Sequence, residues 1–137
     1  LMNRDRSTYQ RLSRRIASRR DMAYMRIGIL YGEQGNHTKA MEYYEKALDQ
    51  NPHNADAHFN KGIAYGKTGQ IELSIQSYEE AVALNPHHVP ANINMGILLF
   101  EQGKLEEARG HFEAVLEVDP SNTTAKEGLG RTRQLLR

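Results

Sequence analysis

Apolar residues recur through most of the chain at spacings of three and four positions, a pattern typical of amphipathic α-helices. The helical stretches come in pairs. A glycine follows the first member of each pair, and an Asn-Pro or Asp-Pro step follows the second. The predicted pairs are 22–34 with 38–50, 56–68 with 72–84, and 90–102 with 105–118. The pattern therefore predicts an all-α protein.

The three pairs are copies of one another, because small and bulky residues return to the same places every 34 residues over 21–54, 55–88 and 89–122. The matching positions are Gly28/Gly62/Gly96, Tyr31/Tyr65/Leu99, Gly35/Gly69/Gly103, Ala40/Ser74/Ala108, Tyr44/Tyr78/Phe112, Ala47/Ala81/Val115 and Pro52/Pro86/Pro120. This pattern resembles the tetratricopeptide repeat family. The resemblance implies a right-handed α-solenoid of antiparallel helix pairs, with residues 21–137 as one domain.

Three of these rows have predicted packing roles. The glycines of the first row let the two helices of a pair approach closely, and the aromatic row fills the gap between helices. The row containing Ala81 lies where a larger side chain would push neighbouring repeats apart. No repeat can bury its apolar face alone, so the stability must come from stacking.

The two ends of the chain depart from the repeat. Residues 1–20 are predicted to form a separate helical arm with Ser7 as its N-cap, and Asp21 is predicted to be the N-cap of the first repeat helix. Residues 123–137 begin like a fourth first helix, without a second one, and are predicted to be a capping helix that keeps the end of the solenoid soluble.

The family resemblance implies a binding surface, since the first helices of successive repeats line a concave face on which peptides bind. Two of the inward rows are apolar here, so we expect an apolar or amphipathic segment as the ligand, with two asparagines as polar anchors. The predicted groove residues are Met25, Arg26, Ile29, Phe59, Asn60, Ile63, Ile93, Asn94, Ile97 and Phe100. The alternative is that the apolar row of Met25 only packs against neighbouring helices.

One subfamily binds the C-terminal carboxylates of heat-shock chaperones through a Lys/Asn, Asn, Lys/Arg set. The matching positions in this chain are Met25, Ile29, Asn60, Pro90 and Asn94, of which Asn60 alone fits that set. Chaperone C-termini are therefore not predicted as ligands.

Charge is distributed unevenly, with basic ends and an acidic middle. The chain has a net charge of +1, but residues 1–20 contain seven arginines and one aspartate. Tyr9, Leu12 and Ile16 form a narrow apolar stripe on this arm, which is therefore expected to pack on something. The arm residues expected to take part are Arg11, Leu12, Arg14, Arg15 and Ile16.

Three alternatives stay open for the arm. It can dock on an acidic repeat surface of its own chain or of a neighbouring subunit, bind nucleic acid or an anionic membrane surface, or remain a solvated helix. Docking on a neighbour would make the protein a self-assembling scaffold and a homo-oligomer, as scaffold proteins of bacterial organelles in this family suggest. Nucleic acid is not favoured, because no aromatic or base-reading motif accompanies the arginines.

Several classes of function are not expected. The chain has no cysteine, and its turn histidines, among them His53, His87 and His88, are expected to be solvated, so no metal site or cofactor is predicted. It has no nucleophile elbow, phosphate loop or HExxH motif, so an enzyme is not expected. The longest apolar run is far shorter than a membrane span, which favours a cytoplasmic protein. The predicted function is non-catalytic protein–protein interaction.

Overall fold

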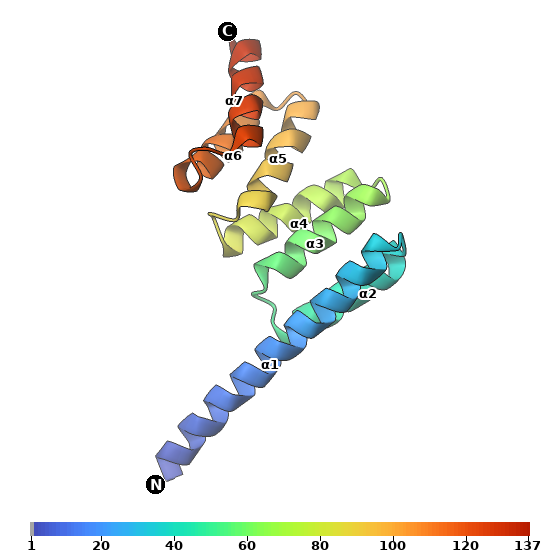
Figure 1. Ribbon diagram of the computed structural model, residues 1–137, viewed down its shortest axis with the longest axis vertical. Coiled ribbons are helices and arrows are strands. Elements are labelled where there is room, and N and C mark those ends of the chain that lie inside the picture. Colours follow the sequence, from blue (N-terminus) through green and yellow to red (C-terminus); the bar gives the residue numbers. More distant parts are fainter. Residues whose placement is uncertain (1) are drawn as a thin grey trace.

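The structure of the protein, a computed structural model, describes residues 2–137, with the side chains of 2–5, 14 and 16–18 left aside. Helices make up the described chain, and no strand occurs in it. They are α1 (Met2–Glu33), α2 (His37–Gln50), α3 (Ala55–Lys67), α4 (Ile71–Leu84), α5 (Val89–Glu101), α6 (Leu105–Val118) and α7 (Thr123–Leu136). The prediction of an all-α solenoid is confirmed (Figure 1).

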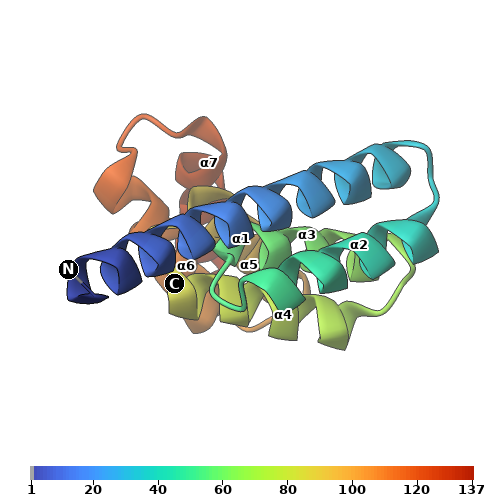
Figure 2. The same ribbon diagram turned by 90° about the horizontal axis from the view of Figure 1, so that it is seen from below.

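The helices form three antiparallel pairs that stack in chain order, α1 with α2, α3 with α4 and α5 with α6, followed by α7 (Figures 1 and 2). The second helix of each pair also packs against the first helix of the next. Contacts thus join neighbours almost exclusively, which is the arrangement of a repeat solenoid.

Each pair is held by an aromatic ring that lies against a glycine. A Cβ atom on Gly28 would lie 2.6 Å from the Tyr44 ring, and one on Gly96 would lie 2.6 Å from the Phe112 ring. Both rings are buried, as is Tyr78, which lies against Gly62 in the same way. Glycine is therefore required wherever the first helix crosses the ring of the second, as the repeat pattern predicted.

Local signals fix the helix ends. The first helix of each pair stops where a glycine adopts a left-handed backbone conformation, as Gly35 does with a φ of 80°. Asparagine side chains cap the starts of α2, α3 and α7, and His88 caps α5 by accepting a hydrogen bond from the Ala91 N–H. The prediction that His88 is solvated is wrong, because only 7% of it is exposed.

The predicted break between the arm and the first repeat is absent. Helix α1 runs without interruption through Ser7 and Asp21, so neither residue is an N-cap. The carboxylate of Asp21 instead accepts hydrogen bonds from the amides of Asn51 at 3.0 Å and Asn54 at 2.8 Å, in the turn between α2 and α3. A residue that looked like a helix start is a tertiary anchor inside a helix.

Candidate functional site

Three hollows lie along the face that the first helices line. The first lies between α1 and α3, has a volume of about 360 Å³, and has the buried ring of Tyr44 at its base. Ile29 and Ile63 give it apolar walls, and Gly32 leaves space where a side chain would stand. Charged groups complete its lining, namely Glu33, His37 and Lys67. Burial, reinforced by the nearby Glu33 carboxylate, raises the pKa of Tyr44, so its hydroxyl stays protonated.

The second hollow, of about 450 Å³, lies beside the first and shares Ile29 and Asn60 with it. Met25 and Phe59 supply its apolar surface, and the turn between α4 and α5 closes one side. The two hollows therefore form one continuous groove over α1 and α3. Its exposed chemistry is mainly aliphatic and aromatic, with amides available as anchors.

A histidine–aspartate pair fixes the wall of the second hollow. His88 Nε2 lies 2.7 Å from an Asp56 carboxylate oxygen, and His88 Nδ1 accepts the Ala91 N–H, so Nε2 carries the proton that is donated to Asp56. The Phe59 ring packs against the imidazole with centroids 5.2 Å apart and against Tyr78 at 5.7 Å. Phe59 is thus positioned by two partners rather than free to move.

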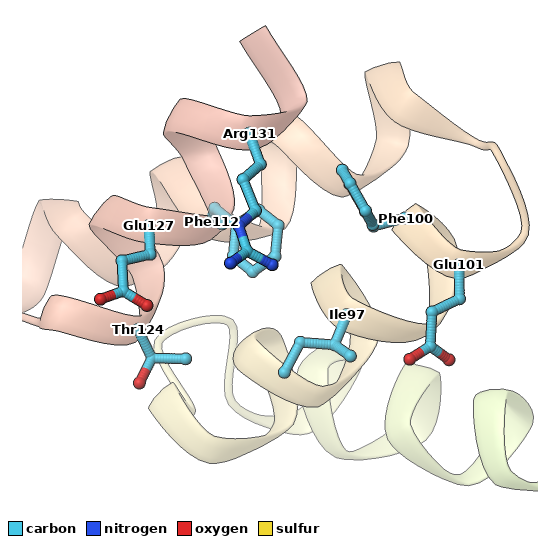
Figure 3. Close-up of a pocket in the computed structure, with 8 residues that line it drawn as sticks. Ile97, Phe100, Glu101, Phe112, Thr124, Glu127 and Arg131 are labelled. Atoms are coloured by element: carbon cyan, nitrogen blue, oxygen red, sulfur yellow. The ribbon is translucent and has the colours of Figure 1, made fainter. Parts of the chain in front are cut away.

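The third hollow, of about 310 Å³, lies at the other end, between α5 and α7 (Figure 3). Ile97 and Phe100 of α5 face it, and Arg131 of α7 reaches over it from the opposite side. Arg131 lies 34 positions after Ile97, so the row that carries isoleucine in the three repeats carries a cation in α7. Glu101 and Glu127 also line this hollow, so the C-terminal end of the face combines an apolar surface with side chains of both charges.

Seven of the predicted groove residues line these hollows. They are Met25, Ile29, Phe59, Asn60, Ile63, Ile97 and Phe100. The other three line none of these hollows: Arg26 is exposed, Ile93 packs against the core, and the Asn94 amide donates to the Tyr78 hydroxyl at 3.2 Å. Asn94 is therefore engaged within the protein, whereas Asn60 faces the groove.

Sequence reasoning missed the polar lining. Lys67, Asp56 and Arg131 line the hollows, yet each lies on a first helix at a position where the other repeats have a different residue. A search of each inward-facing repeat position for the residue that differs from its equivalents would have found these three.

The arm extends away from the repeats as the first half of α1 (Figure 1). Tyr9 is 72% exposed and Leu12 is 47% exposed, so docking of the arm on its own chain is wrong. Arg11 and Arg15 are also exposed, whereas the side chains of Arg14 and Ile16 fall outside the described part of the chain.

Within the described residues, no group of three histidine, aspartate or glutamate side chains is arranged to hold a metal ion. None of the described helices has the length and apolar character needed to cross a membrane.

Family models match the chain along most of its length. Models described as a tetratricopeptide repeat match residues 55–88 and 89–122, and one described as a TPR repeat matches residues 28–69. The first TPR of Spaghetti (RPAP3), solved bound to the HSP90 peptide SRMEEVD, is 31% identical over 87% of this chain and 94% of its own, with a TM-score of 0.79. The chain belongs to the tetratricopeptide repeat family.

Other tetratricopeptide structures agree. The first TPR domain of human RPAP3 is 31% identical, covers 85% of this chain and 92% of its own, and has a TM-score of 0.76. The Arabidopsis OM64 TPR domain is 22% identical over 86% of this chain and 98% of its own, with a TM-score of 0.77, which shows the shared fold. Among curated proteins, none matches the sequence. The chain is thus built as a protein-interaction module of the tetratricopeptide type.

Proposed function

We propose that the protein binds an apolar or amphipathic segment of a protein partner in the groove over α1 and α3, with the hollow at Ile97 as an extension of the same site. The observation that carries this proposal is the continuous apolar lining by Met25, Ile29, Phe59 and Ile63, whose side chains pack on the core and are half-buried at the groove. Burial of a few large apolar side chains there would supply the affinity, since each contributes about 1.5–3 kcal/mol when fully buried.

The groove differs from that of a carboxylate-binding relative. The first TPR of Spaghetti (RPAP3) binds the acidic-ended peptide SRMEEVD, and the resemblance places cations at the positions of Met25, Pro90 and Asn94 in chaperone-binding members. Here Met25 and Pro90 line the second hollow and bring no positive charge, so a terminal carboxylate bound there would lose water without gaining the cations that the resemblance implies at these positions. The ligand is therefore apolar rather than carboxylate-ended.

A peptide-display experiment tests the proposal. Random twelve-residue peptides selected on the full chain should contain two or more large apolar residues, and the synthetic peptide SRMEEVD should bind at least tenfold more weakly than the selected ones. Ile97→Glu and Ile29→Glu should each weaken the selected peptides at least tenfold, because each places a carboxylate against the apolar lining.

Ile71→Glu is the matched control, because Ile71 on α4 is 37% exposed and Ile97 is 38% exposed, yet Ile71 is not among the residues that line the three hollows. This variant should bind the peptides as the unmodified protein does. Selection of acidic C-termini, or equal binding by all three variants, would show that the groove is not the site.

A further inference from the structure

The first helix of every repeat and the capping helix α7 carry an alanine at the same repeat position, and this alanine is buried in all of them except α1. Ala57, Ala91 and Ala125 are fully buried on first helices that pack against the second helix of the preceding repeat, whereas Ala23 of α1 is exposed. These positions are separated by 34 residues, so Ala23 lies on the side of α1 that is equivalent to the buried side of α3, α5 and α7. This side of α1 is an uncovered stacking edge.

The larger residues on that edge confirm that it is apolar. Leu30 is 58% exposed, although Ala64 and Thr132, one and three repeats later, are 5% and 0% exposed. Ile27 is 38% exposed and, together with Leu30, lines a shallow hollow on this edge. The repeat pattern thus places large side chains where only a covering element would remove them from water.

The uninterrupted course of α1 extends this edge along the arm. At 100° per residue, Tyr9, Leu12, Ala23, Ile27 and Leu30 fall within about 60° of arc on one straight helix. We call this set of five positions the α1 stripe. It runs for roughly 30 Å at 1.5 Å per residue. The stripe of the arm and the open stacking edge of the first repeat are therefore one surface.

The edges of the stripe are basic. Arg15, Arg19 and Arg26 follow one side at spacings of four and seven residues, and Arg20 lies on the other side. Asp21, the single acidic residue between Tyr9 and Leu30, is buried against the turn between α2 and α3 and faces away from the stripe. A covering element thus meets an apolar line with exposed arginines beside it.

The protein's own repeat contacts show what fits such a surface. Lys61 of α3 pairs with Glu45 of α2 at 3.2 Å, and Arg133 of α7 lies 3.8 Å from Glu113 of α6. In both cases a cation on a first helix meets a glutamate on the preceding second helix. A covering helix with glutamates beside its apolar line would pair with the arginines of α1 in the same way.

Charge disfavours a second copy of this chain as the occupant. The arginines at 19 and 20 lie at the middle of the α1 stripe, so two antiparallel copies would bring these cations together, and two parallel copies would pair each arginine with itself. Stacking of α1 on the C-terminal end of another copy is disfavoured as well, because α7 is also basic. A membrane surface fits poorly as well, since a stripe this narrow is typical of a helix–helix seam.

We propose that the α1 stripe is a docking site for an acidic amphipathic helix of a partner protein, which adds a layer to the N-terminal end of the solenoid. The apolar line of the partner helix covers the stripe from Tyr9 to Leu30, and its glutamates pair with the flanking arginines. This surface is separate from the groove, so either site can fail without the other.

Two synthetic probes test the proposal on the full chain by fluorescence anisotropy. Both are labelled 28-residue helices with leucine and alanine on one stripe; one carries glutamate on its flanks and the other lysine. The glutamate probe should bind at least tenfold more tightly than the lysine probe, and its binding should weaken as salt is raised. Leu12→Glu and Leu30→Glu should each weaken it at least tenfold.

Leu135→Glu is the matched control, because Leu135 on α7 is 63% exposed and lies at the other end of the molecule. It should leave binding of the glutamate probe unchanged, as should Ile97→Glu in the groove. Equal binding of both probes, no binding of the glutamate probe, or binding that Leu30→Glu leaves intact would overturn the proposal. So would a dimer seen by light scattering that Leu30→Glu disrupts, or sedimentation with phosphatidylglycerol vesicles in place of probe binding.

Discussion

At the scale of single residues, one missing methyl group sets the distance between the helices of a pair. The Gly62 Cα lies so close to the Tyr78 ring that a Cβ would overlap it, and Tyr78 is also held by the Phe59 ring and by the Asn94 amide on its hydroxyl. Rigid neighbours cannot absorb such an overlap cheaply, because protein interiors are close-packed.

Gly62→Ala is therefore expected to destabilise the protein by about 1–3 kcal/mol, as other overpacking changes do. Gly130→Ala is the control. Gly130 lies in the interior of α7 with no atom within 4 Å of its virtual Cβ, so alanine should stabilise the protein by up to about 1 kcal/mol through helix propensity. Urea unfolding followed by circular dichroism measures both. Similar effects of the two substitutions would contradict the close approach at Gly62.

His111 links stability to pH. Burial lowers the pKa of His111 below its ordinary value of 6.5, against the opposing effect of the Glu107 and Glu79 carboxylates. Its Nδ1 lies 2.9 Å from the Asn92 carbonyl oxygen, whose amide donates to backbone carbonyls, so Nδ1 is the donor. The neutral imidazole is the form that the folded state holds.

Because the unfolded chain takes up this proton more readily than the folded one, the contribution of His111 to stability is fully present above about pH 6.5 and declines as the pH falls below it. His111→Gln keeps an N–H donor and removes the titration. Between pH 7.5 and 5, the free energy of unfolding should fall more in the unmodified protein than in this variant. Parallel pH profiles would show that His111 does not titrate differently on unfolding.

At the scale of elements, Asp21 ties the long helix to the turn that follows its partner. Its carboxylate accepts from Asn51 and Asn54, and only 2% of the residue is exposed. Tyr43 adds a second contact between α1 and α2 by stacking on Tyr31 with centroids 5.6 Å apart. The arm is thus the extension of a helix that is anchored to the repeats.

Asp21→Ala should cost about 1–3 kcal/mol, because it leaves the partly buried amide donors of Asn51 and Asn54 without this acceptor. Asp49→Ala, which removes an exposed aspartate from α2, should change stability by less than about 0.5 kcal/mol. Thermal unfolding measures the overall effect, and amide hydrogen exchange in α1 reports whether the loss is local. Equal stability of the two variants would show that the Asp21 contacts carry no net stabilisation.

Most of the helix pattern could be predicted from sequence, because glycine and proline end helices through backbone geometry that does not depend on distant residues. The first repeat was the exception. An aspartate before an apolar run is typical of an N-cap, but an N-cap needs a non-helical backbone and Asp21 lies inside α1. Its carboxylate instead accepts a hydrogen bond from Asn51, 30 residues away. Sequence spacing alone does not reveal such a contact.

The candidate groove could be predicted row by row but not residue by residue. Ile29 and Ile63 occupy equivalent positions and both line it, whereas Asn60 and Asn94 are also equivalent and differ, because the Tyr78 hydroxyl engages Asn94. His88 was missed for a similar reason: its partner Asp56 lies 32 residues earlier, on another helix. Equivalent residues of different repeats occupy equivalent positions, but the partners of each side chain decide whether it is available to contact a ligand.

At the scale of the whole molecule, stability is a sum of contacts between neighbours. Helices of the first pair do not pack on helices of the third pair. The second pair is therefore the sole link between them among the helix contacts of the described chain. Damage at the interface of α4 should therefore affect a larger share of the structure than equal damage at either end.

Ala81→Arg places this damage at a fully buried position on α4. A buried, unpaired guanidinium in a site sized for a methyl group should remove the cooperative unfolding transition or lower its midpoint by more than 10 °C, given that each 1 kcal/mol shifts a domain of this size by roughly 4 °C. Ala83→Arg, two residues later on the exposed side of the same helix, should shift the midpoint by less than about 2 °C. Circular dichroism melts of the two variants give the comparison directly. Because the substitutions are identical in chemistry and helix, a similar midpoint in both would mean that the α4 face assigned to the stack does not hold the repeats together.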